Sequence, residues 1–250
     1  MDKLIIFGSS WSAGEWAIDD SIGTELKLIH PGMSEYLSDT FKVVNFSKGS
    51  SSLWKIIYSI HNYCEMSYVD IENTVNPAKI IVFQNDPFMS ALSEKFNVDY
   101  QRIFSECTDL KNLYQTLTEI FYIKLSELQQ KYKIDIYLCG GASDIDINLL
   151  ALYPNLKLLC ESWIKLLDDS HIPSVIPLQW SRDSLPITRK YGRLDLCEQI
   201  IDASDNNFAS LQKLLESKYI GPVFGDYHPN RLGHEVMANY IKNFFKKTQL

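Results

Sequence analysis

Near its N-terminus the chain reads Leu4-Ile5-Ile6-Phe7-Gly8-Ser9-Ser10, a short apolar run that ends in a glycine and two serines. A continuous, partly β-branched run of this length is typical of a strand covered on both faces of a sheet. Gly8 permits a tight exit from that strand, and Ser10 then stands where a short helix can begin. The stretch predicts a buried parallel strand followed directly by an accessible serine.

Further apolar runs follow at intervals, and helical patterns separate them. The other expected strands are Val43–Phe46, Ile80–Phe83, Ile134–Leu138 and Ser174–Pro177. The expected helices are Ser51–Tyr63, Leu110–Tyr132, Leu156–Leu167, Leu194–Tyr219 and a closing helix from Leu232 onward. Strands that alternate with helices predict an α/β fold with a mainly parallel sheet and helices on both sides, an α/β/α sandwich. We expect one domain over residues 1–250, with insertions around residues 140–220.

The composition argues against several classes of partner. A net charge of −7 argues against a nucleic-acid partner or an anionic membrane surface. No apolar run approaches the roughly 18–20 residues that span a bilayer, and the first run is too short for a secretory signal, so we expect a cytoplasmic protein. The five cysteines are scattered without metal-ligand spacing. They predict free, mostly buried thiols and no metal site.

Candidate functional residues follow three of the expected strands, where open parallel sheets bind their ligands. Ser10 follows the first strand, Gly49 the second, and Asn85 with Asp86 the third. A serine hydroxyl can act as a nucleophile, and the Gly49 N–H and the Asn85 amide can donate to a developing oxyanion. Each loop also has a plain structural explanation, as a helix cap, a connecting loop or an Asx turn.

The last motif is Asp226-Tyr227-His228-Pro229, just before the closing helix. An Asp two residues before a His lies on the same side of an extended segment. The carboxylate of Asp226 can then bond Nδ1–H of His228 and leave Nε2 free as a base. The alternative is a turn in which the Asp caps the helix and the His has no chemical role.

Taken together, these blocks resemble those of the SGNH (GDSL-type) hydrolases. Gly8-Ser9-Ser10 is similar to the GDS turn of that family, Gly49 to its glycine block, Asn85-Asp86 to its G-x-N-D block, and the last motif to its D-x-x-H-P block. The resemblance covers residues 8–234 and implies a three-layer α/β/α sandwich with a five-stranded, flavodoxin-like sheet. The segments around Trp11 and Asn85 also resemble a phage-associated and bacterial subgroup.

Three positions depart from the family pattern. Ser9 stands where the GDS turn has its Asp, and Phe83 stands where G-x-N-D has its Gly. The interval from Asp226 to His228 holds one residue instead of two. The sequence therefore leaves open whether Asp226 completes a triad or the site works as a Ser–His dyad.

The resemblance implies a serine esterase that needs no metal or organic cofactor. Its substrate would be a small acyl ester, with acetyl esters on carbohydrate as the first candidate. The implied catalytic residues are Ser10, Asp226 and His228, the oxyanion donors are Ser10, Gly49 and Asn85, and the substrate contacts are Trp11 and Asp86. The alternatives are an O-acyltransferase on the same site and a non-catalytic module that binds carbohydrate or protein. The sequence does not indicate whether the protein is a monomer or an oligomer.

Overall fold

The structure is a computed structural model that describes residues 1–18, 26–49, 51–73, 78–85, 110–141, 143–169, 229 and 231–248. The chain divides into two compact units, and each is built from two separate stretches of sequence. The sheet unit comprises residues 1–12 and 40–162, and the second unit comprises residues 13–39 and 163–250.

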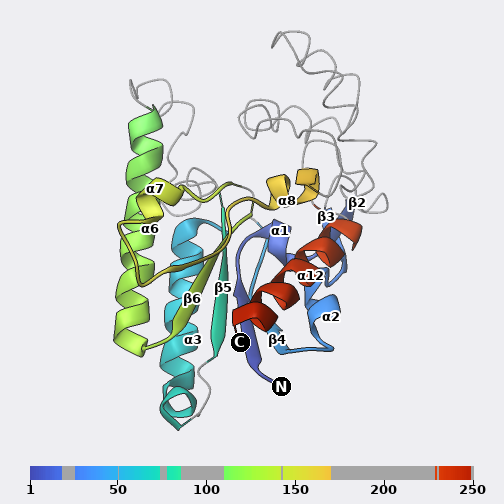
Figure 1. The fold of residues 1–250 in the computed structure, drawn as a ribbon, viewed down its shortest axis with the longest axis horizontal. Coiled ribbons are helices and arrows are strands. Elements are labelled where there is room, and N and C mark those ends of the chain that lie inside the picture. The colour runs from blue at the N-terminus through green and yellow to red at the C-terminus, as the bar shows by residue number, and fades with distance from the viewer. Residues whose placement is uncertain are drawn as a thin grey trace. The chain divides into compact units, whose positions relative to one another are not determined.

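The sheet unit is organised by five parallel strands in the order β4-β1-β5-β6-β7 (Figure 1). Their bounds are Lys3–Phe7 (β1), Lys42–Asn45 (β4), Lys79–Gln84 (β5), Asp135–Gly140 (β6) and Lys157–Cys160 (β7). From β1 the chain pairs first with β4 on one side, and β5 later pairs on the other side. This reversal of strand order is where open α/β sheets bind ligands, at the carboxyl ends of the strands.

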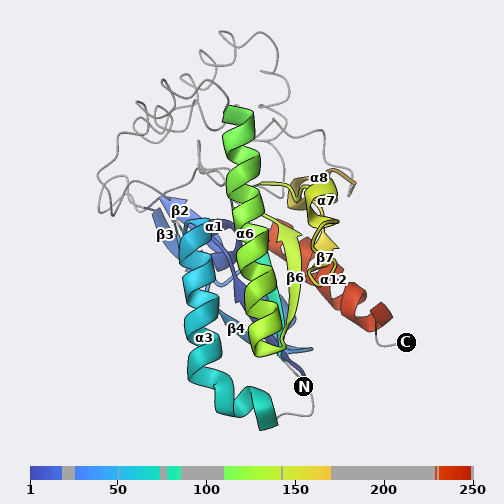
Figure 2. The same cartoon turned by 90° about the vertical axis from the view of Figure 1, so that its left-hand side faces the viewer.

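Helices α3 (Leu53–Asn73) and α6 (Leu110–Tyr132) lie side by side over one face of this sheet (Figures 1 and 2). Their apolar stripes, which include Ile56, Ile60 and Phe121, form one core with alternate strand residues such as Ile5 and Ile80. The residues between these on the strands are buried as well. Burial on both faces explains why these strands read as continuous apolar runs.

The described residues of the second unit form an antiparallel hairpin and three helices. The hairpin joins β2 (Glu15–Ile18) to β3 (Leu26–His30), and the helices are α2 (Met33–Leu37), α8 (Trp163–Asp169) and α12 (Arg231–Thr248). Helix α12 packs on α2. His234 of α12 is fully buried, and its ring makes an edge contact with Trp163, with 5.3 Å between centroids. Gly32 has a φ of 57°, and a Cβ there would lie 2.6 Å from Nδ1 of His234.

The α/β class and the five-stranded parallel sheet are confirmed, and four of the strands lie within two residues of their predicted bounds. Helix α6 has its predicted bounds, while α3 continues beyond residue 63 to Asn73. The predicted strand 174–177 and helix 194–219 lie outside the described residues. The single-domain prediction remains a prediction.

One helix prediction was wrong. Residues 157–160, expected to be helical, form the edge strand β7, and the helix α8 begins only at Trp163. An apolar run this short does not distinguish a helix from a strand. The edge of β6 offers backbone partners in register, with Tyr137 opposite Lys157 and Leu138 opposite Leu158, and that pairing decides the outcome.

Two further findings concern side chains and membranes. Cys64, Cys139 and Cys160 are buried thiols that form no disulfide, as predicted for these three residues. No helix in the described ranges has both the length and the apolar character required to cross a bilayer.

Candidate functional site

Three of the predicted site residues follow adjacent strands of the sheet unit. Ser10 is the first residue of the short helix α1 (Ser10–Ala13), which follows β1. Gly49 lies in the loop after β4, and Asn85 follows β5 directly. Because β4, β1 and β5 are parallel neighbours, these loops leave the sheet at the same side, at the carboxyl ends of the strands. This is also the point where the strand order reverses.

The turn after β1 is tightly packed. A Cβ on Gly8 would lie 2.1 Å from Oγ of Ser12 and 2.9 Å from Cβ of Phe83, so only glycine fits there. The N–H of Ser12 donates to the Ser9 carbonyl at 3.2 Å and closes the turn. The Ser9 side chain is buried, whereas Ser10 is only half-buried. The turn therefore exposes Ser10 more than its neighbours.

Polar side chains join this turn to the loop after β4. Oγ of Ser12 is bonded to the Ser9 carbonyl at 3.1 Å and to Oγ of Ser47 at 2.9 Å. Asn45 donates from Nδ2 to the Ser12 carbonyl at 2.8 Å and accepts the Ser47 N–H at its Oδ1 at 2.9 Å. We call Ser12, Asn45 and Ser47 the serine latch. Sequence reasoning missed it, and the only signal was a polar Asn45 at the end of an apolar strand.

Asn85 joins the loop after β5 to the start of α3. Its side chain is fully buried, and Nδ2 donates to the Ser51 carbonyl at 2.6 Å. One of the two amide N–H groups is therefore committed, and one remains to serve another acceptor. Among the described residues, Oδ1 of Asn85 is buried without a hydrogen-bond partner, which is uncommon in folded proteins.

The buried side chain of Gln84 also holds the loop after β5. Gln84, the last residue of β5, accepts from the Tyr122 hydroxyl at 2.8 Å and donates to the Asp144 carbonyl at 3.0 Å. The Ser143 hydroxyl donates to the Asn85 carbonyl at 3.1 Å. Burial raises the pKa of the Tyr122 phenol, so this hydroxyl keeps its proton and remains a donor. The network fixes the backbone of Asn85.

The structure gives less support to the other predicted site residues. Asp86, Asp226 and His228 lie outside the described residues, so their roles remain predictions. Trp11 is only 6% exposed, which leaves little of its ring for a substrate. No group of three or more metal-binding side chains occurs in the part of the chain that the structure describes.

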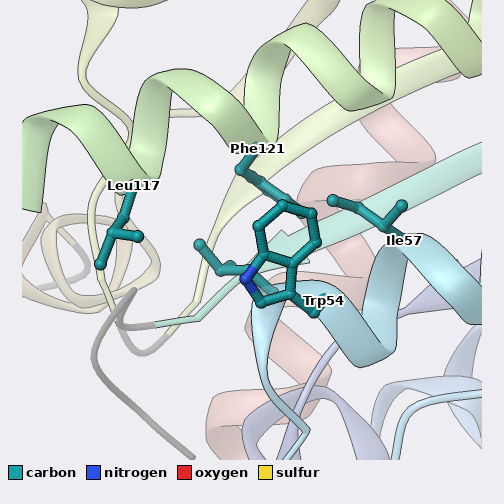
Figure 3. Close-up of a pocket in the computed structure, with 5 residues that line it drawn as sticks. Trp54, Ile57, Leu117 and Phe121 are labelled. Atoms are coloured by element: carbon teal, nitrogen blue, oxygen red, sulfur yellow. The ribbon is translucent and has the colours of Figure 1, made fainter. Parts of the chain in front are cut away.

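A small cavity in the sheet unit is lined by apolar and aromatic side chains. Figure 3 shows Trp54 and Ile57 of α3 facing Leu117 and Phe121 of α6, and Leu53 completes the lining. Its volume of about 10 Å³ is at the lower limit for one water molecule. With the Trp54 indole N–H as the one polar side-chain group of this lining and no room for a ligand, this cavity offers no chemistry.

Comparison with known proteins gives no close relative. No protein-family model matches the chain, and no curated protein matches it. A member of the lipolytic G-D-S-L family from Veillonella parvula is similar in structure, with 14% identity, a TM-score of 0.48 and coverage of 99% of this chain and 100% of that one. A candidate acylhydrolase from Bacteroides fragilis has 11% identity, a TM-score of 0.45 and coverage of 99% and 88%. Because both TM-scores lie below 0.5, the case for a function rests on the site itself.

Proposed function

We propose that the protein is a serine esterase of the SGNH type in which Ser10 is the nucleophile. The observation that carries this proposal is the position of Ser10, half-buried at the start of a helix just beyond β1. The loops on the neighbouring strands bring a backbone N–H at Gly49 and an amide at Asn85 to the same edge. Acyl transfer requires this combination of an accessible hydroxyl and preorganised donors.

In the proposed reaction, Oγ of Ser10 attacks the ester carbonyl while His228 takes its proton. The N–H groups of Ser10 and Gly49 and the uncommitted N–H of Asn85 receive the oxyanion. The intermediate collapses, His228 protonates the leaving alcohol, and water then releases the acid from the acyl-enzyme. Asp226 orients the imidazole in a triad. In a dyad, His228 acts without it. The assignment of His228 and Asp226 is supported by the sequence motif alone.

We propose a small acyl group for the substrate, with acetyl esters on carbohydrate as the first candidate. Asp86 is the proposed substrate contact, and Trp11, which is only 6% exposed, can add no more than a small area to it.

A non-catalytic binding module is the second candidate, and one observation favours it. The Asn85 side chain is fully buried and already donates to Ser51. An oxyanion donor must reach the reacting oxygen at about 2.7–3.1 Å, and burial restricts that approach. A test of serine reactivity separates the two candidates.

The test compares Ser10→Ala with Ser38→Ala, whose exposed hydroxyl bonds only locally to Glu35. With p-nitrophenyl acetate as the probe, we expect Ser10→Ala to lose at least about 10³-fold in kcat, because removal of a nucleophile leaves only residual catalysis. Ser38→Ala should retain wild-type turnover, and circular dichroism should show both variants folded.

A fluorophosphonate probe followed by peptide mass spectrometry provides the second readout. We expect the adduct on the peptide that contains Ser10 in the wild-type chain and no adduct in Ser10→Ala. Full turnover by Ser10→Ala would contradict the esterase assignment. A wild-type chain that neither turns over ester nor accepts the probe would favour the binding module.

A further inference from the structure

We infer that the serine latch of Ser12, Asn45 and Ser47 positions Ser10 for attack and aims its N–H at the oxyanion. This inference rests on the proposed function. It gives a role in ordering the turn to three residues outside the predicted motifs, at a turn where Ser9 stands in place of the Asp of the GDS pattern.

The latch has a definite direction of hydrogen bonding. The Ser9 carbonyl can only accept, so the single proton of the Ser12 hydroxyl goes to it. Oγ of Ser12 must then accept from the Ser47 hydroxyl at 2.9 Å. Asn45 links the same two residues a second time, because its amide donates to the Ser12 carbonyl and accepts from the Ser47 N–H. In this arrangement the Ser12 hydroxyl both donates and accepts a hydrogen bond, and so does the Asn45 amide.

The two carbonyl groups that the latch holds lie on either side of Ser10. One belongs to Ser9 and the other to Ser12. The Ser9 carbonyl and the Ser10 N–H belong to the same planar peptide unit. Fixing the carbonyl oxygen therefore fixes the direction in which the Ser10 N–H points. That N–H is one of the proposed oxyanion donors.

Helix α1 cannot supply this order by itself. It has four residues, and a single helical turn is unfavourable in isolation because its nucleation is costly. The buried side chain of Ser9 carries no carboxylate that could brace the loop. The bonds from the neighbouring β4 loop, which include the Lys48 N–H to the Gly8 carbonyl at 3.4 Å, therefore hold the turn in place.

The experiment removes the side chains of the latch at its two half-buried positions, Asn45 and Ser47. In Ser47→Ala and Asn45→Ala we expect kcat for p-nitrophenyl acetate to fall about tenfold while KM changes less than about twofold, because one misaligned hydrogen bond is worth about this factor. The rate of fluorophosphonate labelling at Ser10 should fall in parallel. Ser47→Thr keeps the hydroxyl and should restore both rates.

Ser126→Ala is the matched control. This serine of α6 is also part-buried, and its hydroxyl bonds to the Asn155 side chain at 3.1 Å. We expect Ser126→Ala and the latch variants all to lower Tm by ~3 °C. Ser126→Ala should leave kcat unchanged. A purely structural latch would behave as this control does.

The outcomes separate the latch from the proposed function. If Ser10→Ala loses turnover while Ser47→Ala and Asn45→Ala keep their kcat, the latch inference is wrong and the esterase assignment stands. If Ser47→Thr fails to restore kcat, the latch hydroxyl is not what positions Ser10. Full turnover by Ser10→Ala would refute the proposed function and the latch with it.

Should Asn45→Ala fail to fold, Asn45→Asp is the second variant. It keeps the acceptor for Ser47 and removes the donor to Ser12, and a wild-type kcat in that variant would also overturn the inference.

Discussion

Gly8 shows how a single residue without a side chain constrains the site. The space beside its Cα is filled by Oγ of Ser12 and by Cβ of Phe83. Both neighbours are held, Ser12 by the serine latch and Phe83 by its burial in β5. The chain can therefore leave β1 for Ser10 only through a residue that has no Cβ.

We expect Gly8→Ala to destabilise the protein by about 1–3 kcal/mol, the usual cost of forcing an extra methyl into a packed site. Turnover should fall as well, because relief of the clash displaces the turn that carries Ser10. Urea unfolding and p-nitrophenyl acetate hydrolysis measure the two effects. An unchanged free energy of unfolding would show that the turn is looser than the contacts indicate.

At the scale of elements, the long helix α6 and four of the sheet strands were predictable, whereas β7 and the hairpin were not. Helix α6 repeats its apolar stripe over 23 residues, so its bounds could be predicted, and the strands with continuous apolar runs were equally clear. Strand β7 and the hairpin of β2 and β3 have four or five residues each. In segments this short the pairing partner decides the structure, and a sequence read in order does not show the partner.

The contact between α6 and β5 gives a prediction about a buried polar network. Tyr122→Phe removes the hydroxyl that donates to Oε1 of Gln84, and we expect a loss of about 1–3 kcal/mol because a buried acceptor is left unsatisfied. The double variant Tyr122→Phe with Gln84→Leu should cost less than the sum of the single variants. Thermal unfolding of the four proteins completes the cycle, and simple additivity would contradict the coupling.

At the scale of the whole molecule, the meeting of the three loops could be predicted, and their detailed contacts could not. Ligands bind at the carboxyl edge of a parallel sheet, and this rule alone places Ser10, Gly49 and Asn85 at one edge from the order of the sequence blocks. The serine latch depends on which side chains of β4 face the β1 turn, and this is set by strand order. Asp226 and His228 lie outside the described residues, so their place remains a prediction.

An ion pair between Asp2 and Lys79 links the amino ends of β1 and β5, with 2.5 Å between Oδ2 and Nζ. The hydrogen bond from Lys79 holds the pKa of Asp2 below its usual value of 3.8. A lowered pKa in the folded state means that the pair stabilises the fold above the unfolded pKa. That stabilisation is lost as the pH falls through the folded pKa.

We therefore expect Asp2→Asn to lower Tm at pH 7 by an amount equivalent to at most ~1 kcal/mol, the usual range for a partly exposed pair. The difference in Tm between variant and wild type should shrink as the pH is lowered below 3.8. Calorimetry across that range measures it. A difference that stays constant down to pH 2 would mean that the pair is not the cause.

The division of the chain into interleaved stretches has a consequence for its synthesis on the ribosome. Strand β1 is made before its partner β5, which is complete only at Gln84. Helix α2 packs on α12, which begins at Arg231. At about 5–20 residues per second, the nascent chain carries α2 without α12 for roughly 10–40 s. During that time Met33 and Leu37, which are fully buried in the finished protein, lack this covering helix and are available to a chaperone.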